Sequence, residues 1–233
     1  MTSRRNILTT GLAAGAASLA APAVLAQGAP IKWRLQTYAG AALGAEVVKP
    51  AIDLFNQIAN GQMEIELFYA DQLVPTAELF RAMQKGTIDA VQSDDDSMAS
   101  PTEVTVFGGY FPLALRYSLD VPVLFNHWGL DQIWKEEYAK VGIQHISAGA
   151  WDPCNFSTKK PINSLADLQG QRIFKDKMKL TTIPDAEWAT VQTEAEKFWE
   201  EIAAESELKA KVVGIIKKYN ETMVKAGPPY RYG

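Results

Sequence analysis

The sequence predicts an α/β fold in which an open sheet is flanked by helices. Between residues 31 and 92, extended and helical patterns alternate in the order strand, helix, strand, helix, strand, which is typical of such a sheet. The chain has 233 residues, of which 47% are hydrophobic and 21% charged, the composition of an ordinary globular protein. This length accommodates one large domain or two small ones.

Residues 1–26 are expected to form an export signal rather than part of the fold. Arg4 and Arg5 precede a stretch rich in Ala, Gly and Leu that ends in small residues at Ala26, the pattern of a twin-arginine signal peptide. The alternative, a weakly amphipathic or buried helix, suits the stretch poorly because it has no polar face. Cleavage would remove two positive charges and take the net charge from −4 to −6, and a mildly acidic chain argues against nucleic acid as a partner. We therefore expect a periplasmic protein.

The first elements follow from the spacing of apolar residues. Residues 31–37 alternate between apolar and polar side chains, as a half-buried strand does. A helix is expected over residues 45–59, where Pro50 either kinks it or marks its first turn. A second strand, a second helix and a short third strand are expected over residues 63–68, 77–85 and 88–92.

The remainder of the chain contains longer helical patterns. Residues 118–125 suit either a strand or a turn-rich crossover, residues 129–140 a helix, and residues 142–148 a further strand. Two amphipathic helices follow, one starting near Thr182 at a pattern that resembles a capping box and one starting at Ser206. Such helices need an apolar surface to lie on, and residues 149–182 offer little of one.

Polar side chains follow the predicted strands at the points where open α/β sheets bind ligands. Tyr38 comes directly after the first strand, and Asp94 opens an acidic run of three residues after the third strand. A solvated turn is the alternative for the acidic run. A calcium-binding loop is disfavoured, because Met98 and Ala99 occupy the positions of an oxygen ligand and the loop glycine.

A third candidate segment mixes an aromatic residue with polar ones. Trp151, Asp152 and Asn155 together have the makings of a specific polar site. The alternative is that Trp151 belongs to the core and Asn155 caps a turn. Pattern alone leaves these two interpretations open.

The sequence contains no recognisable catalytic motif and indicates no metal site or cofactor. His127 and His145 lack a partner at zinc-binding spacing, and His145 is expected to be a satisfied structural histidine within a strand. The lone cysteine, Cys154, is expected to be a small packed residue. An exported acidic α/β chain of this kind favours a binding protein, with an exported α/β hydrolytic enzyme as the alternative.

Four stretches carry a resemblance to a known family: "WRLQTYAG", "ELFYADQLVPTAELFRAMQKGTIDAVQSDDD", "SAGAWDPCNFSTKKPINSLADLQGQRIF" and "KAGPPYRY". Together they resemble the solute-binding subunit of tripartite ATP-independent periplasmic (TRAP) transporters. The resemblance implies a periplasmic-binding-protein-like fold, with two α/β lobes that close on a small organic acid of the 2-oxo or 2-hydroxy class. It also implies membrane permease subunits of a TRAP transporter as partners, and not an enzyme.

The resemblance implies a first lobe over residues 27–145, and a hinge, a truncated second lobe and C-terminal helices over residues 146–233. "QRIF" is followed at once by "KDKMKL", so the middle of the second lobe is missing relative to the family pattern. Poor ligand binding, exposed apolar helix faces and self-association are the expected consequences. A cation bound with the ligand is implied by analogy, without a recognisable set of ligands.

The resemblance also assigns ligand-binding residues. Those that match the family's pattern are Tyr38, Asp94, Trp151, Asp152 and Asn155. Arg172 is the nearest arginine to the position of the family's carboxylate clamp, although it lies two residues before Phe174, where many relatives carry the clamp.

Overall fold

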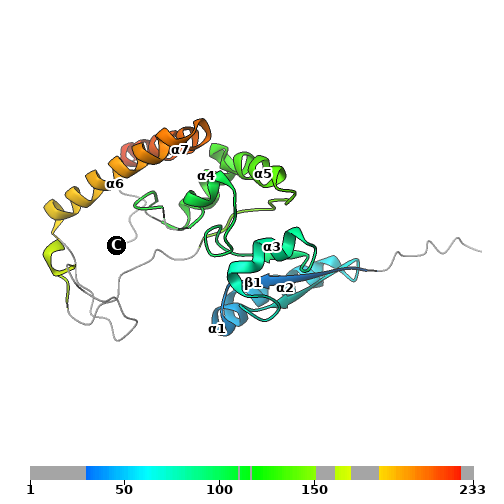
Figure 1. Cartoon of the computed structure of the whole chain (residues 1–233). Helices are drawn as coiled ribbons and strands as arrows, with labels where there is room; N and C mark the ends of the chain where they lie inside the picture. Colours follow the sequence, from blue (N-terminus) through cyan, green and yellow to red (C-terminus); the bar gives the residue numbers. More distant parts are fainter. Residues whose placement is uncertain (1–29, 110, 116, 151–160, 169–183, 227–233) are drawn as a thin grey trace, which may run out of the picture.

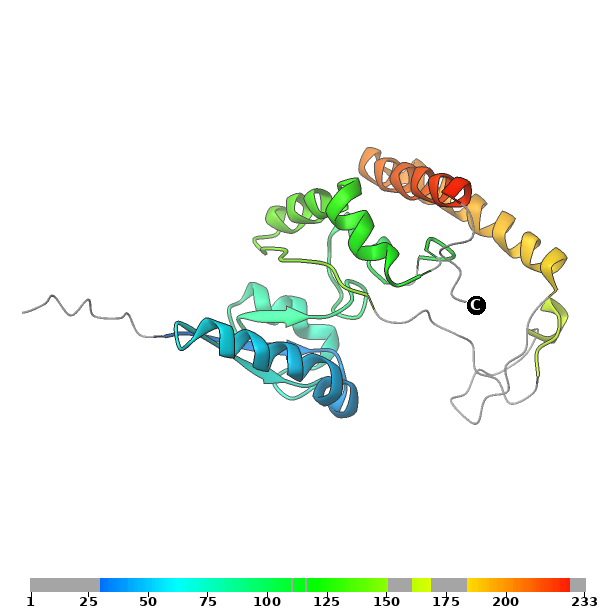
Figure 2. The ribbon, with the colours of Figure 1, turned by 180° about the vertical axis from the view of Figure 1, so that it is seen from behind.

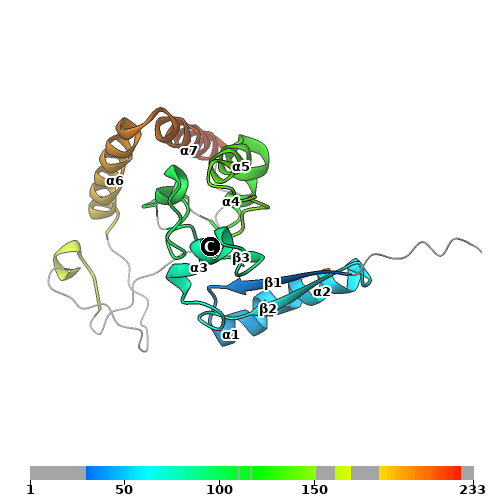
Figure 3. The same cartoon turned by 45° about the vertical axis from the view of Figure 1, so that its right-hand side comes forward.

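The computed structural model of the chain describes residues 30–109, 111–115, 117–150, 161–168 and 184–226. The predicted open sheet is confirmed. Its strands β1 (Ile31–Thr37), β2 (Met63–Phe68) and β3 (Ala90–Gln92) are all parallel and lie in the order β2-β1-β3 (Figure 3). Because the strands are parallel, their carboxyl ends share one edge of the sheet.

The first helical segment begins earlier than the sequence predicts. It consists of α1 (Ala41–Leu43), a π-helical turn η1 (Gly44–Val48) and α2 (Lys49–Ala59). Pro50 lies at the start of α2, directly after the π-helical turn. Gly44 permits a close approach to Tyr69, because a Cβ on Gly44 would lie 2.4 Å from that ring. Helix α2 packs on β2.

The loop after β2 is tied to the centre of the sheet. The buried Gln36 side chain accepts hydrogen bonds from the N–H groups of Leu73 and Val74, at 2.9 and 3.0 Å, and donates to the Val74 carbonyl at 2.7 Å. The chain then enters a 3₁₀ turn η2 (Thr76–Glu78) and α3 (Leu79–Gln84), as predicted.

Two predictions in the middle of the chain are wrong: a strand or turn-rich crossover over residues 118–125, and a strand over residues 142–148. The segment over residues 118–125 lies mostly in helix α4 (Asp120–Trp128), and α5 (Leu130–Lys140) follows as predicted. Asp120 and Leu124 are both buried, four residues apart, which is the helical period. Residues 142–148 form no strand, and Ile146 is 64% exposed. Alternation makes a strand only where a neighbouring strand is available to pair with it.

The C-terminal helices are α6 (Asp185–Glu205) and α7 (Glu207–Ala226), and a short 3₁₀ turn η4 (Leu165–Leu168) precedes them. The predicted helix start at Ser206 is confirmed, and its Oγ caps α7 by accepting a hydrogen bond from the Lys209 N–H at 3.2 Å. The capping box predicted for the first helix begins at Thr182, which lies outside the described residues, so it stays a prediction. In the described part of the chain, the N-cap residue of α6 is Pro184, with no side-chain capping hydrogen bond.

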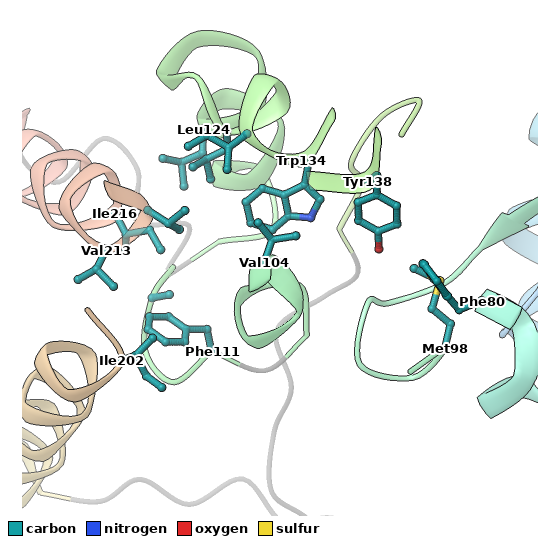
Figure 4. Packing of buried hydrophobic residues seen from close by; sticks show 14 of the residues in the cluster. Phe80, Met98, Val104, Phe111, Leu124, Trp134, Tyr138, Ile202, Val213 and Ile216 are labelled. Carbon is teal, nitrogen blue, oxygen red and sulfur yellow. The ribbon is translucent and has the colours of Figure 1, made fainter. Parts of the chain in front are cut away.

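The hydrophobic core runs from α3 to α7 and is centred on the 3₁₀ segment η3 (Glu103–Phe107). Figure 4 shows Val104 between Trp134 and Leu124 of the α4–α5 pair and Ile216 of α7. In Figures 1 and 2, α4 and α5 lie between the sheet and the α6–α7 pair. The segment from η3 to α5 therefore supplies the apolar surface that the C-terminal helices need.

This packing corrects the prediction of exposed helix faces. On α7 the apolar side chains Val212, Val213 and Ile216 are buried. On α6, Trp188 remains 45% exposed and Phe198 36% exposed. Exposed apolar side chains thus remain on both helices, because Val224 near the end of α7 is 65% exposed. The boundary between lobes at residue 145 stays a prediction. None of the helices in the described part of the chain is both long and apolar enough to cross a membrane.

Candidate functional site

The loops that follow β1 and β3 are joined at the carboxyl edge of the sheet. The Tyr38 N–H donates to the Gln92 carbonyl at 3.0 Å. Thr37 Oγ1 donates to the Gln92 side chain and accepts from the Ala39 N–H at 3.0 Å. Thr37 is fully buried, so these bonds hold the Tyr38 loop against the acidic run.

Tyr38 and Asp94, which the sequence predicts as ligand-binding residues, are brought together here. Burial raises the pKa of the Asp94 carboxyl, and the charge of Asp96 raises it further. Hydrogen bonds from Ser97 and Tyr38 lower this pKa, the Ser97 Oγ lying 3.4 Å from Asp94 Oδ2. A half-buried carboxylate beside a tyrosine hydroxyl at the strand ends offers both an acceptor and a donor to a small polar ligand.

The other predicted binding residues lie outside the described residues. These are Trp151, Asp152, Asn155 and Arg172, and Cys154 lies there too. Their assignment stays a prediction.

Asp95, the middle residue of the acidic run, points into the core. Its carboxylate accepts hydrogen bonds from Trp134 Nε1 at 2.9 Å and from the Tyr138 hydroxyl, both on α5. Burial raises the pKa of Asp95 even though these two bonds act in the opposite direction. Gly108 makes room for this carboxylate, because a Cβ there would lie 1.8 Å from Asp95 Oδ2. Asp95 therefore anchors the acidic loop rather than facing a ligand.

The Asp96 side chain points neither toward Tyr38 nor into the core, and its carboxylate lies over Gly109. A Cβ on Gly109 would lie 2.5 Å from the Asp96 carboxyl carbon, so the Gly108-Gly109 pair seats two adjacent carboxylates. The sequence alone assigns this pair no role, and the only signal for one is two consecutive glycines among aromatic residues. Asp96 also opens a groove of about 280 Å³, which is lined by Asp96, Thr105, Val106, Gly109, Phe111, Pro112 and Phe198.

The expectation that His145 lies in a strand with its ring nitrogens hydrogen-bonded is wrong. Its Nδ1 is buried and has no hydrogen-bond partner, and the nearest carboxylate oxygen, Asp131 Oδ1, lies 3.8 Å away. The ring stacks on Phe125 and tilts against Tyr138. Among the described residues, no group of three or more His, Cys, Asp or Glu side chains is placed to hold a metal ion.

Acid is expected to destabilise the protein through His145. Burial lowers the pKa of His145, as does Lys135, and the carboxylates of Asp95 and Asp131 oppose this only in part. The unfolded chain, with the ordinary value of 6.5, binds this proton more readily. The contribution to stability is therefore complete above pH 6.5 and is lost as the pH falls from 6.5 through the lower folded-state pKa.

Urea unfolding between pH 7.5 and 5 measures this effect. We expect His145→Gln to flatten the pH dependence of the free energy of unfolding relative to wild type. His127→Gln, at an exposed position, should leave the dependence unchanged. Equal slopes for wild type and His145→Gln would contradict the prediction.

Comparisons with known proteins agree with this architecture. The sequence profile described as "Bacterial extracellular solute-binding protein, family 7" (DctP) matches residues 42–181. A crystal structure of a TRAP periplasmic solute binding protein from Chromohalobacter salexigens, with bound (S)-(+)-2-amino-1-propanol, is 47% identical. It superposes with a TM-score of 0.80, and the match covers 87% of this chain and 99% of that chain.

Two more distant relatives share parts of the chain. DctP7, a Bordetella pertussis extracytoplasmic solute receptor binding pyroglutamic acid, is 19% identical over 60% of this chain and 46% of its own, with a TM-score of 0.50. That likeness shows the fold alone. A curated monocarboxylate 2-oxoacid-binding periplasmic protein from Nostoc sp. is 26% identical over 148 residues, or 61% of this chain and 40% of its own length. The chain thus matches less than half of this curated relative.

These matches give no support to the exported hydrolase that the sequence left as an alternative. The family profile covers more than half of the chain and includes the acidic loop, most of the groove and α4–α5. The chain therefore belongs to family 7 of the bacterial extracellular solute-binding proteins, the DctP family of extracytoplasmic TRAP solute-binding proteins.

Proposed function

We propose that this chain is a periplasmic solute receptor, not an enzyme, and that it presents a small organic solute to the membrane permease subunits of a TRAP transporter. The observation that carries the proposal is the contact between Tyr38 and Asp94 at the carboxyl ends of β1 and β3. Open α/β sheets bind ligands at this edge. Family membership supplies the transport role.

The first solute class is a small organic acid of the 2-oxo or 2-hydroxy type. The 2-oxoacid-binding relative from Nostoc supports this class. In this proposal Trp151 and Asn155 line the ligand cleft together with Tyr38, and Arg172 is the nearest candidate to hold the carboxylate. An aromatic wall with amide donors suits a carboxylate next to a carbonyl or hydroxyl group, because each polar group needs a partner in a closed site.

A second solute class, a small amino alcohol, is favoured by a specific observation. The 47%-identical relative is described with bound 2-amino-1-propanol, whose amine is cationic at neutral pH. Within the described part of this chain, neither Asp94 nor Asp96 forms an ion pair with a Lys or Arg side chain. Carboxylates without such a partner suit a cationic ligand better than an anionic one.

A ligand panel tests the receptor function. Thermal unfolding of the full chain is measured with pyruvate, lactate, pyroglutamate, 2-amino-1-propanol and a neutral diol, each at millimolar concentration. We expect at least one ionic solute to raise the melting temperature, because a ligand that binds only the folded state stabilises it. The neutral diol should have no effect. Absence of any shift across the panel would refute the receptor proposal.

Isothermal titration with the solutes that raise the melting temperature decides the prediction that the short second lobe impairs binding. The solved relative from Chromohalobacter, of which this chain covers 99%, is described with a bound solute. This supports ligand binding by a chain of this extent. Binding in the micromolar range or tighter would overturn the prediction of impairment.

A further inference from the structure

The groove that starts at Asp96 combines one carboxylate with aromatic walls. It has a volume of about 280 Å³, below the roughly 300–1,000 Å³ of pockets that hold drug-sized ligands, so it suits a smaller molecule. Phe111 is held in place by stacking on Trp199 at 5.8 Å and by contact with Phe107 at 4.8 Å. Phe198, from α6, lies 5.9 Å from Phe111.

The charged groups in and beside the groove are acidic. Asp96 is exposed, and its Oδ1 accepts a hydrogen bond from the Ser97 N–H at 2.9 Å. A carboxylate can accept about four hydrogen bonds, so acceptor capacity remains. None of the described lining residues is basic, and the second carboxylate, Asp94, is close enough for its pKa to be raised by Asp96. An anion in this groove would be repelled by both carboxylates, and a cation would be attracted.

The aromatic rings favour the same kind of ligand. An ammonium group is attracted to the face of an aromatic ring by about 0.5–2 kcal/mol, and the attraction is larger where water is excluded. Phe198 is 36% exposed and offers ring surface to the groove, whereas Phe111 is nine-tenths buried and forms an apolar wall. The Asp96 carboxylate and the Phe198 ring are therefore two independent groups that attract an ammonium group. Val106 and Pro112 add apolar contacts for the carbon skeleton of a short ligand.

We propose that this groove binds the ammonium group of a small amine solute, with Asp96 as the charged partner and the rings of Phe111 and Phe198 as its walls. The inference rests on the proposed receptor function and names the residues that select an amine over an acid. Gly109 is a positioning residue in this proposal, because only glycine leaves room for the Asp96 carboxylate.

Isothermal titration of the full chain with (S)-2-amino-1-propanol tests the proposal. We expect Asp96→Asn to weaken binding roughly tenfold or more, because the substitution removes a charge-assisted hydrogen bond. Phe198→Ala should weaken it about threefold or more through the lost ring. The matched control is Asp53→Asn, an exposed carboxylate of α2 that pairs with Lys49, which should bind as wild type. Neutral 1,2-propanediol, which has a hydroxyl in place of the amine, should not bind measurably.

The outcomes separate the inference from the receptor function. Equal affinity of wild type and Asp96→Asn for the amine would overturn the inference. So would binding of pyruvate or lactate with no binding of the amine, a result that leaves the receptor function standing. If none of these solutes binds, the receptor function itself fails. Thermal unfolding of the unliganded variants confirms that each is folded.

Discussion

Replacing Gly108 by alanine is expected to destabilise the protein by about 2–4 kcal/mol, a large part of the roughly 5–15 kcal/mol that stabilises a typical domain. The added Cβ would lie 1.8 Å from Asp95 Oδ2 and 2.5 Å from Asp95 Cβ. Since Asp95 has a short side chain, the clash requires a shift of its backbone. Trp134 Nε1 and the Tyr138 hydroxyl would then lose their buried acceptor, and an unsatisfied buried donor costs about 1–3 kcal/mol.

Urea unfolding followed by tryptophan fluorescence measures this loss. Gly214→Ala is the matched control, because a Cβ added to this helical glycine would meet no atom of a neighbouring segment within 4 Å. Alanine there should stabilise by about 0.5–1 kcal/mol through helix propensity. Gly109→Ala provides a second comparison, since it displaces only the exposed Asp96 carboxylate. A midpoint for Gly108→Ala equal to that of wild type would contradict the account of Asp95 as an anchor.

Replacing Asp120 by alanine is expected to loosen α7, at a cost of about 2–4 kcal/mol. The buried Asp120 carboxylate accepts hydrogen bonds from the Tyr219 hydroxyl at 2.6 Å and from the Tyr117 N–H at 3.1 Å. Tyr219 is fully buried and packs edge-on against Trp128 at 5.4 Å. Removal of the carboxylate takes an acceptor away from a buried hydroxyl, and the pairing of α7 with α4 weakens.

Two measurements test this expectation. The urea midpoint of Asp120→Ala should fall, and sedimentation should show more self-association, because a loosened α7 exposes its apolar face. Glu221→Ala, at an exposed position on the same helix, should stay within about 0.5 kcal/mol of wild type. An unchanged midpoint together with unchanged sedimentation would show that α7 does not depend on Asp120.

The sequence predicted correctly the strands and helices whose apolar side chains recur at a clear strand or helix spacing. The strands near residues 31–37 and 63–68, the helix through Pro50 and the helix over residues 129–140 all carry a clear period of two or 3.6 residues, and the structure confirms them. Family membership was also readable, because four separate stretches carry it together. These features depend on local spacing and composition, which a single sequence contains in full.

The predictions for the middle of the chain were wrong for a physical reason. The patterns over residues 118–125 and 142–148 are each consistent with more than one structure, and the contacts that decide between them come from residues distant in the chain. Leu124 is buried in a core that α7 completes, almost 90 residues further along. His145 lies against Phe125 and Tyr138 rather than in a sheet. An apolar pattern determines which face of a segment is buried only when another part of the chain packs against that face.

In the candidate site, too, local sequence predicted some features and distant residues decided others. The sequence placed Tyr38 and Asp94 at the ends of neighbouring strands, and this follows from strand order alone. Only the tertiary structure decided the roles of the three consecutive aspartates. Asp95 is buried because Trp134 and Tyr138, 39 and 43 residues away, donate to it, while Gly108 and Gly109 leave space for Asp95 and Asp96. Identical carboxylates acquire different roles because burial, hydrogen-bond donors and free volume are set by residues that are distant in the chain.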